Sequence, residues 1–125
     1  MSIKVYEYKN CTTCKKALQF LETQKISYEK LPIVENPPSI NELKKMLQFI
    51  KNDGGRIQKL FNTSGILYRE MKIAIKIKNG MSEKEALELL SQNGKLIKRP
   101  FLLTTQGGTV GFKREIWAQL LSPTK

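Results

Sequence analysis

The chain has 125 residues, with 22 lysines and arginines against 11 aspartates and glutamates, a net charge of +11, and no histidine. The lack of histidine excludes catalysis by an imidazole base and removes the commonest metal ligand. Two cysteines alone do not complete a four-ligand zinc site, so we expect no bound metal; a zinc site shared between two chains is the alternative.

No apolar run approaches the ~20 residues of a membrane span, and the strand-like N-terminus differs from a signal peptide. We therefore expect a cytoplasmic protein of bacterial type that does not contact a membrane. The lysines are spread along the chain rather than gathered into a tract, so we expect no direct nucleic-acid binding. The length fits a single domain over residues 1–125, and we expect a monomer.

The N-terminal part predicts a strand, a helix and a second strand. Apolar and polar residues alternate over residues 3–8, which is typical of a strand, and apolar residues then recur at helical spacing over 13–24. Residues 26–33 predict a second strand, although Pro32 indicates that its end is not centrally paired.

A block of helices is expected next, after the break at Asn36-Pro37-Pro38. Ser39 and Ser82 each begin a capping box, a pattern that marks the start of a helix. The expected elements are a helix from Ser39 to about residue 52, a helical turn over 57–61, a loop over 62–65, a helix over 68–77 and a helix from Ser82. The alternation of Ile73, Ile75 and Ile77 leaves a strand as the alternative for residues 68–77.

The C-terminal part predicts a β-hairpin and a helix. We expect a strand over 101–104, a turn over 106–108, a return strand over 110–112 and an amphipathic helix over 116–121. The order β-α-β, helices, β-β-α predicts an α/β fold with a four-stranded mixed sheet. This is the thioredoxin-like arrangement, with a helical insertion at about 36–95.

Cys11 and Cys14 form a C-x-x-C pair that follows a strand and opens a helix, the context of a redox motif. Amides at a helix start stabilise a thiolate, the nucleophilic form, and Lys9, Lys15 and Lys16 add positive charge. Cys14 lies one turn further along the same helix face. We predict that Cys11 attacks and that Cys14 resolves the adduct by forming an internal disulfide. The alternative is a pair of buried core thiols.

Arg99 and Pro100 form a second candidate part of the site. In a thioredoxin-like fold the proline before the third strand faces the C-x-x-C loop and is often cis. Arg99 would then bring a guanidinium toward Cys11, to bind an oxyanion or stabilise a thiolate; the alternative is a surface arginine at a strand start. Pro100, with Thr12 and Thr13 between the cysteines, is expected to be structural near the site.

Several segments together carry a family resemblance that covers nearly the whole chain. They are residues 11–17, 37–43, 60–65, 68–69, 97–100 and 110–113. On these segments the chain resembles the arsenate reductase (ArsC) and Spx/MgsR family of thioredoxin-fold proteins. The nearest pattern is that of an uncharacterised ArsC-like group with Asn-Thr-Ser-Gly and Tyr-Arg.

The resemblance implies that Cys11 is the redox cysteine. In glutaredoxin-linked arsenate reductases one cysteine attacks arsenate, and three arginines hold the anion. Arg99 matches one of these arginines, whereas Asn62 and Lys113 stand at the other two positions. Those reductases lack a thiol at the Cys14 position. The C-x-x-C pair is like that of the Spx branch, where it is a redox switch in a protein that binds RNA polymerase, although that branch has an arginine where this chain has Ser64.

Two functions follow as hypotheses. The first is an ArsC-like thiol-disulfide reductase that acts through Cys11 on a thiol or a small oxyanion held by Arg99, Lys113 and Asn62. It would bind no cofactor and would draw on an external thiol donor, glutathione, glutaredoxin or thioredoxin, as its redox partner. The second is an Spx-like regulator in which oxidation of Cys11 and Cys14 changes binding to RNA polymerase. An inert descendant of the fold is a third alternative.

Overall fold

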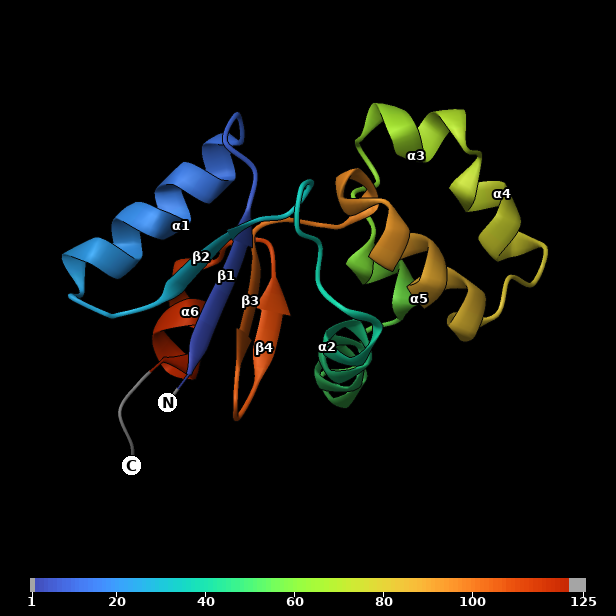
Figure 1. Cartoon of the computed structure of the whole chain (residues 1–125). Helices are drawn as coiled ribbons and strands as arrows, with labels where there is room; N and C mark the ends of the chain where they lie inside the picture. The colour runs from blue at the N-terminus through green and yellow to red at the C-terminus, as the bar shows by residue number, and fades with distance from the viewer. Residues whose placement is uncertain (1, 122–125) are drawn as a thin grey trace.

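The computed structural model describes residues 2–121, and Figure 1 shows a sheet with helices on both faces. The elements in chain order are β1 (Ile3–Glu7), α1 (Thr12–Thr23), β2 (Glu29–Pro32), α2 (Ile40–Asn52), η1 (Ile57–Leu60), α3 (Ile66–Glu70), α4 (Ile73–Lys78), α5 (Glu83–Gln92), η2 (Gly94–Leu96), β3 (Phe101–Thr104), β4 (Gly108–Val110) and α6 (Arg114–Leu120). Across residues 2–121, no helix is both long enough and apolar enough to span a membrane.

Four strands form one mixed sheet in the order β2-β1-β3-β4. β1 runs parallel to β2 and antiparallel to β3, and β4 returns antiparallel beside β3. The parallel strands β1 and β2 are joined through α1, because a parallel pair needs a crossover connection. The antiparallel strands β3 and β4 are joined by a short hairpin. The predicted α/β fold with a four-stranded mixed sheet is confirmed, and a block of helices connects β2 to β3.

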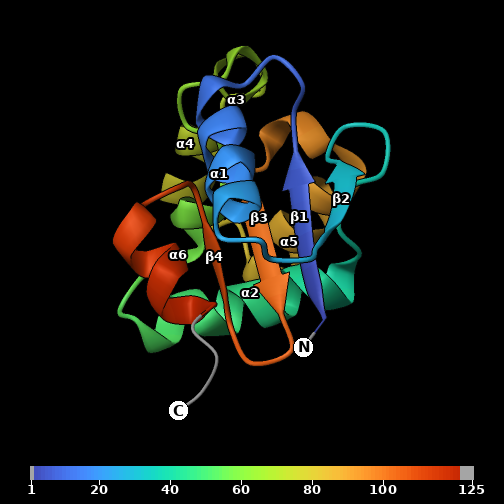
Figure 2. The same ribbon diagram turned by 90° about the vertical axis from the view of Figure 1, so that its left-hand side faces the viewer.

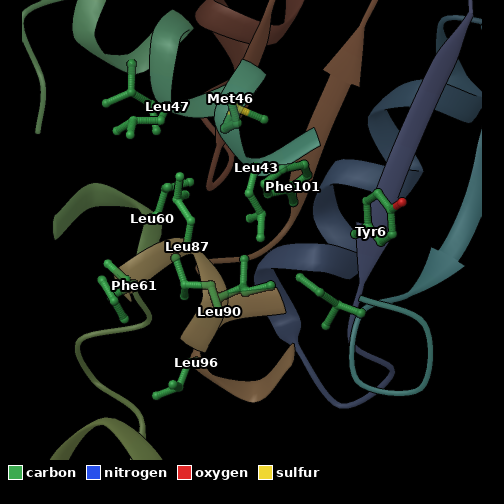
Figure 3. Packing of buried hydrophobic residues seen from close by; sticks show 14 of the residues in the cluster. Tyr6, Leu43, Met46, Leu47, Leu60, Phe61, Leu87, Leu90, Leu96 and Phe101 are labelled. Atoms are coloured by element: carbon green, nitrogen blue, oxygen red, sulfur yellow. The ribbon is translucent and has the colours of Figure 1, made fainter. Parts of the chain in front are cut away.

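Alternating side chains of the strands divide the hydrophobic core between the two faces of the sheet. Val5 and Leu102 point toward α1 and α6, where Trp117 is fully buried. Tyr6 and Phe101 point the other way, into the larger cluster that the sheet shares with α2, α5 and the short helical turns (Figure 3). Figure 2 shows α1 and α6 in front of the sheet and the helical block behind it.

Glu42 ties the helical block to the sheet. It belongs to the predicted capping box of α2: the Ser39 side chain accepts a hydrogen bond from the Glu42 amide, and the Glu42 carboxylate accepts one from the Ser39 amide. The same carboxylate accepts hydrogen bonds from Lys4 Nζ and from the Tyr6 hydroxyl, each at 2.7 Å, on β1. The start of α2 is thereby fixed against β1, the strand that precedes the loop of residues 8–11, which carries Cys11 and is called the thiol loop below.

The second strand is shorter than the predicted 26–33, because the end of α1 uses the residues before it. Lys25 adopts a left-handed conformation with φ 57°. The amides of Lys25 and Ile26 donate to the carbonyls of Glu22 and Leu21, which is the hydrogen-bond pattern of a Schellman cap. Ile26 therefore packs in the core beside α1 instead of entering the sheet.

The helix predicted over 68–77 is helical in the structure but divided into α3 and α4. The break lies at Lys72, whose φ of 54° is left-handed. This turn sends Ile73 into the core and leaves Ile75 exposed, so the alternation of isoleucines does not indicate a strand. The break between the two short helices allows Ile73 to be buried, and helical spacing alone does not predict this break.

The hairpin closes earlier than predicted, so that β4 covers 108–110 rather than 110–112. The Thr104 hydroxyl accepts hydrogen bonds from the amides of Gln106 and Gly107, and the Thr104 amide donates to the Gly107 carbonyl. Gly108 thus belongs to the return strand and not to the turn. The last helix likewise begins before the predicted 116, with Lys113 at its N-cap.

Candidate functional site

Cys11 is the N-cap residue of α1, the longest helix on its face of the sheet. Its sulfur accepts a hydrogen bond from the backbone amide of Cys14 at 3.2 Å, and its own amide donates to the Tyr8 carbonyl at 3.1 Å. The side chain is half-buried, so a reagent in solvent can reach it. The geometry sets the sulfur at the positive end of the helix.

Cys14 lies one turn further on and is fully buried. Burial raises the pKa of its thiol to about 12, and the hydrogen bond and negative charge of Cys11 act in the same direction. The two cysteines are both free thiols in the structure. At neutral pH the pair therefore combines a sulfur held at the helix start with a buried thiol that keeps its proton.

The thiol loop shares one end of the sheet with the residues around Pro100. Tyr6, Phe101 and Val110 lie side by side across β1, β3 and β4. The buried Pro100, whose bond to Arg99 is cis, comes directly before this row on β3, and its carbonyl accepts a hydrogen bond from the Gly111 amide at 2.8 Å. Thr13, in the first turn of α1, lines one cavity together with Arg99 and Gly111, so segments that are far apart in sequence meet beside the start of α1.

Arg99 is half-buried and lies over an aromatic ring. Its guanidinium carbon is 4.5 Å from the centroid of the Tyr8 ring, and Nη1 donates to the Lys95 carbonyl at 3.3 Å. A cation stacked on a ring in this way is held by the charge distribution of the aromatic face. The structure therefore places Arg99 over the loop that leads to Cys11, rather than as a free surface arginine.

Lys113 reaches the site because the chain turns sharply after β4. Gly111 has a left-handed φ of 77°, and its carbonyl accepts a hydrogen bond from the Trp117 indole N–H at 3.0 Å. Phe112 then packs edge-on against Trp117, with ring centroids 5.2 Å apart. These contacts fix the exposed Lys113 at the start of α6, beside the end of β4.

Two cavities meet at Arg99. The first, which we call the basic groove, has a volume of about 320 Å³ and is lined by Thr13, Lys59, Lys98, Arg99, Thr109, Val110, Gly111, Phe112, Lys113 and Ile116. The second, of about 310 Å³, is lined by Tyr8, Asn62, Gly65, Ile66, Leu67, Glu70, Lys95 and Arg99. Of the predicted anion-binding residues, Arg99 and Lys113 thus line the first cavity, and Arg99 and Asn62 line the second.

The remaining predicted residues lie at the edges of this region. Thr12 and Thr13 form the exposed first turn of α1, and Thr13 lines the basic groove. Pro100 is buried at the sheet end.

Sequence reasoning missed Tyr8, Lys59 and Lys98. Lys98 precedes Arg99, which was a usable signal. No sequence signal links Lys59 to the site, because Lys59 and Lys98 are brought together only by an isolated bridge between Phe61 and Ile97. That bridge joins segments more than thirty residues apart, supported by the Lys98 amide donating to the Leu60 carbonyl at 2.7 Å.

Comparison with known proteins is consistent over nearly the whole chain. The ArsC family model matches residues 6–120. The Bacillus subtilis protein YusI, which is uncharacterised, is 45% identical over 117 residues, covering 92% of this chain and 94% of YusI. A crystal structure of an ArsC-family-related protein from Bacteroides fragilis has a TM-score of 0.87 at 39% identity, with 96% and 98% of the two chains covered. The global transcriptional regulator Spx of Streptococcus agalactiae is 26% identical, over 85% of this chain and 73% of Spx. The chain therefore belongs to the ArsC family, whose thioredoxin-like fold it shares.

Proposed function

We propose that the chain is a thiol-disulfide reductase of the ArsC family, in which Cys11 is the nucleophile and Cys14 the resolving thiol. The observation that carries the proposal is the asymmetry of the pair. Cys11 accepts a hydrogen bond from a backbone amide at the start of α1 and is reachable from solvent, whereas Cys14 is buried with a raised pKa. This asymmetry suits an attacking and a resolving sulfur better than two equivalent core thiols.

The reaction transfers two electrons from the protein to a disulfide substrate. The Cys11 thiolate attacks one substrate sulfur, a bond forms between the two sulfurs, and the substrate S–S bond breaks to release the first thiolate, which takes up a proton. Cys14 then loses its proton and attacks Cys11, which releases the second substrate thiol and leaves a disulfide between Cys11 and Cys14. An external thiol donor, glutathione, glutaredoxin or thioredoxin, returns the pair to the reduced form.

The raised pKa of Cys14 sets the order of the two steps. Burial is its first cause, but the hydrogen bond and charge of Cys11 are also among the causes. When Cys11 enters a mixed disulfide, its sulfur loses the negative charge, and that part of the effect disappears. Cys14 therefore becomes easier to deprotonate only after Cys11 has reacted.

Arg99 and Lys113 are the groups proposed to hold an anionic substrate, because both line the basic groove that reaches α1. Asn62 lies on the other side of Arg99 and supplies a neutral amide. The arsenate reductases that the sequence resembles hold their anion with three arginines. We therefore propose a disulfide as the substrate here, with reduction of a small oxyanion as the weaker activity.

The test is reduction of a glutathione mixed disulfide, and separately of arsenate, by the wild type and by Cys11→Ser and Cys14→Ser. The wild type should turn over the mixed disulfide with a recycling thiol donor, and Cys11→Ser should be inactive. Cys14→Ser should accumulate an adduct of one glutathionyl group on Cys11, detected by mass spectrometry. Absence of turnover by the wild type with every donor would reject a reductase.

A second candidate is a redox-sensing regulator, which the Spx relative favours. In this function oxidation of Cys11 and Cys14 would change binding to RNA polymerase. The measurement is retention of RNA polymerase on the immobilised protein under reducing and oxidising conditions, with Cys14→Ser as the variant that cannot form the internal disulfide. Binding that is absent in both conditions would reject the regulator.

A further inference from the structure

The basic groove gathers four cationic side chains. Lys59, Lys98, Arg99 and Lys113 line it, and its described lining residues include no acidic side chain. Thr13, which lies between the two cysteines in the sequence, belongs to the same lining, so the groove reaches the first turn of α1. A volume of about 320 Å³ is at the lower end of cavities that hold drug-sized ligands. The groove therefore suits an anionic ligand.

One side of the groove is the open edge of the sheet. β4 is an edge strand, and Thr109, Val110 and Gly111 line the groove. The Gly111 amide donates to Pro100 on the β3 side. Because backbone groups alternate between the two sides of an antiparallel strand, the N–H and C=O of Val110 face the open edge. An extended peptide can pair with such an edge, which a small anion cannot do.

We infer that the substrate disulfide is carried by an extended polypeptide segment with acidic residues next to its cysteine. This inference rests on the proposed exchange at Cys11. The segment lies in the basic groove along the edge of β4, and its acidic side chains pair with Lys59 and Lys98. Its cysteine sulfur thereby comes to the start of α1.

The exchange follows the same two steps as the proposed reaction, with the same transfer of two electrons. Cys11 attacks the sulfur of the peptide cysteine, the bond from that sulfur to its former partner breaks, and the partner leaves as a thiolate that takes up a proton. Cys14 then releases the peptide as a thiol. The two electrons come from the cysteine pair and are replaced by the external thiol donor.

The experiment uses the Cys14→Ser protein and three peptides of equal length, each carrying a central cysteine as its pyridyl disulfide. The residues flanking the cysteine are glutamate, serine or lysine. Attack by Cys11 releases pyridine-2-thione, whose absorbance gives the rate. The pyridyl disulfide of mercaptoethanol reports the reactivity of Cys11 without a peptide. We expect the glutamate peptide to react about tenfold or more faster than the lysine peptide at low salt, with a ratio that falls as salt is added.

Charge reversal tests where the preference arises. Lys59→Glu and Lys98→Glu should each lower the ratio of glutamate-peptide to lysine-peptide rates by several-fold. The matched control is Lys84→Glu on α5, which lines a different groove, between α2 and α5. Figure 1 shows α5 across the sheet from α1, so this variant should leave the ratio unchanged. Equal rates for the three peptides, or an equal effect of Lys84→Glu, would overturn the inference.

A binding measurement separates the groove from the chemistry. The Cys11→Ser/Cys14→Ser protein cannot exchange disulfides, but it should still bind a fluorescent glutamate peptide in preference to a lysine peptide, as measured by anisotropy. Preferential binding with no reaction at Cys11 would uphold the groove and reject the reductase. Reaction at Cys11 without any peptide preference would uphold the reductase and reject the role of the groove. Displacement of the peptide by inorganic phosphate at equal concentration would show that the groove takes small oxyanions and would overturn the inference.

Discussion

Replacing Cys11 by serine leaves Cys14 as the single thiol of the chain, so alkylation of this variant reports on Cys14 alone. Burial raises the pKa of Cys14 to about 12 from the ordinary value of 9.0. At pH 8 an ordinary thiol is about one-tenth thiolate, whereas Cys14 is thiolate in about one molecule in ten thousand. Since the thiolate is the nucleophile, the full shift would slow the reaction of native Cys14 about a thousandfold relative to the unfolded chain; in this variant, where burial acts without the contribution of Cys11, the native reaction should still be slower by more than about tenfold.

The assay is alkylation by iodoacetamide under reducing conditions, followed by mass spectrometry, across about pH 7 to 10. The unfolded reference is the same variant in concentrated guanidinium chloride. Its rate should level off above pH 9, while the native rate keeps rising about tenfold per pH unit. The substitution removes the contribution of Cys11 to the pKa but leaves burial, its first cause. A native rate that levels off near pH 9, close to the unfolded rate, would refute the burial of Cys14.

The same shift predicts how stability depends on pH. Above pH 9 the unfolded chain loses the Cys14 proton, which the native protein keeps, so the free energy of unfolding falls as pH rises toward 12. One proton accounts for at most about 1.4 kcal/mol per pH unit. Burial also raises the pKa of Tyr6, helped by its bond to Glu42, which adds a loss above pH 10. Cys14→Ala should lose the Cys14 part and keep the rest, and denaturant unfolding at pH 8 and pH 10 under reducing conditions compares the two proteins.

Three further predictions concern the frame around the site. Burial alone would raise the pKa of Glu42, but hydrogen bonds from Lys4, Tyr6 and the Ser39 amide outweigh it and lower the pKa; Glu42→Gln should therefore cost about 1–3 kcal/mol at neutral pH, a difference that shrinks as pH falls through the lowered pKa. Ser82→Ala removes the side-chain cap of α5 and should cost about 1 kcal/mol, with no change if the cap is not formed in solution. A Cβ at Gly94 would meet the backbone of Ile33 and Val34, so Gly94→Ala should lower stability by about 1–3 kcal/mol, and an unchanged unfolding midpoint in denaturant would contradict this packing.

The parts of the fold that sequence reasoning predicts correctly depend on neighbours along the chain. The capping boxes at Ser39 and Ser82 both form, because their hydrogen bonds join residues three apart. The strand before Cys11 and the helix after it follow from periodicity in the same way. The position of Cys11 at a helix start therefore follows from the local pattern of residues alone.

The errors fall where distant contacts overrule a local pattern. Lys72 breaks a predicted helix so that Ile73 enters the core. The early close of the hairpin is different, because the Thr104 hydroxyl makes it through hydrogen bonds to amides only two and three residues away. The break at Lys72 has no such local basis, since the side chains that fill a core are chosen by what lies around them in space.

By itself the sequence determined the order of elements, the C-x-x-C pair at a strand-to-helix junction, and the identity of the anion-binding candidates. Tertiary structure alone decided that Cys14 is fully buried and Cys11 only half-buried, that Arg99 stacks on Tyr8, and that Lys59 comes to the same groove as Lys113. The physical reason is that spacing along a helix sets which residues share a face, whereas solvent exposure and charge neighbours are set by the packing of segments that the chain brings together from far apart.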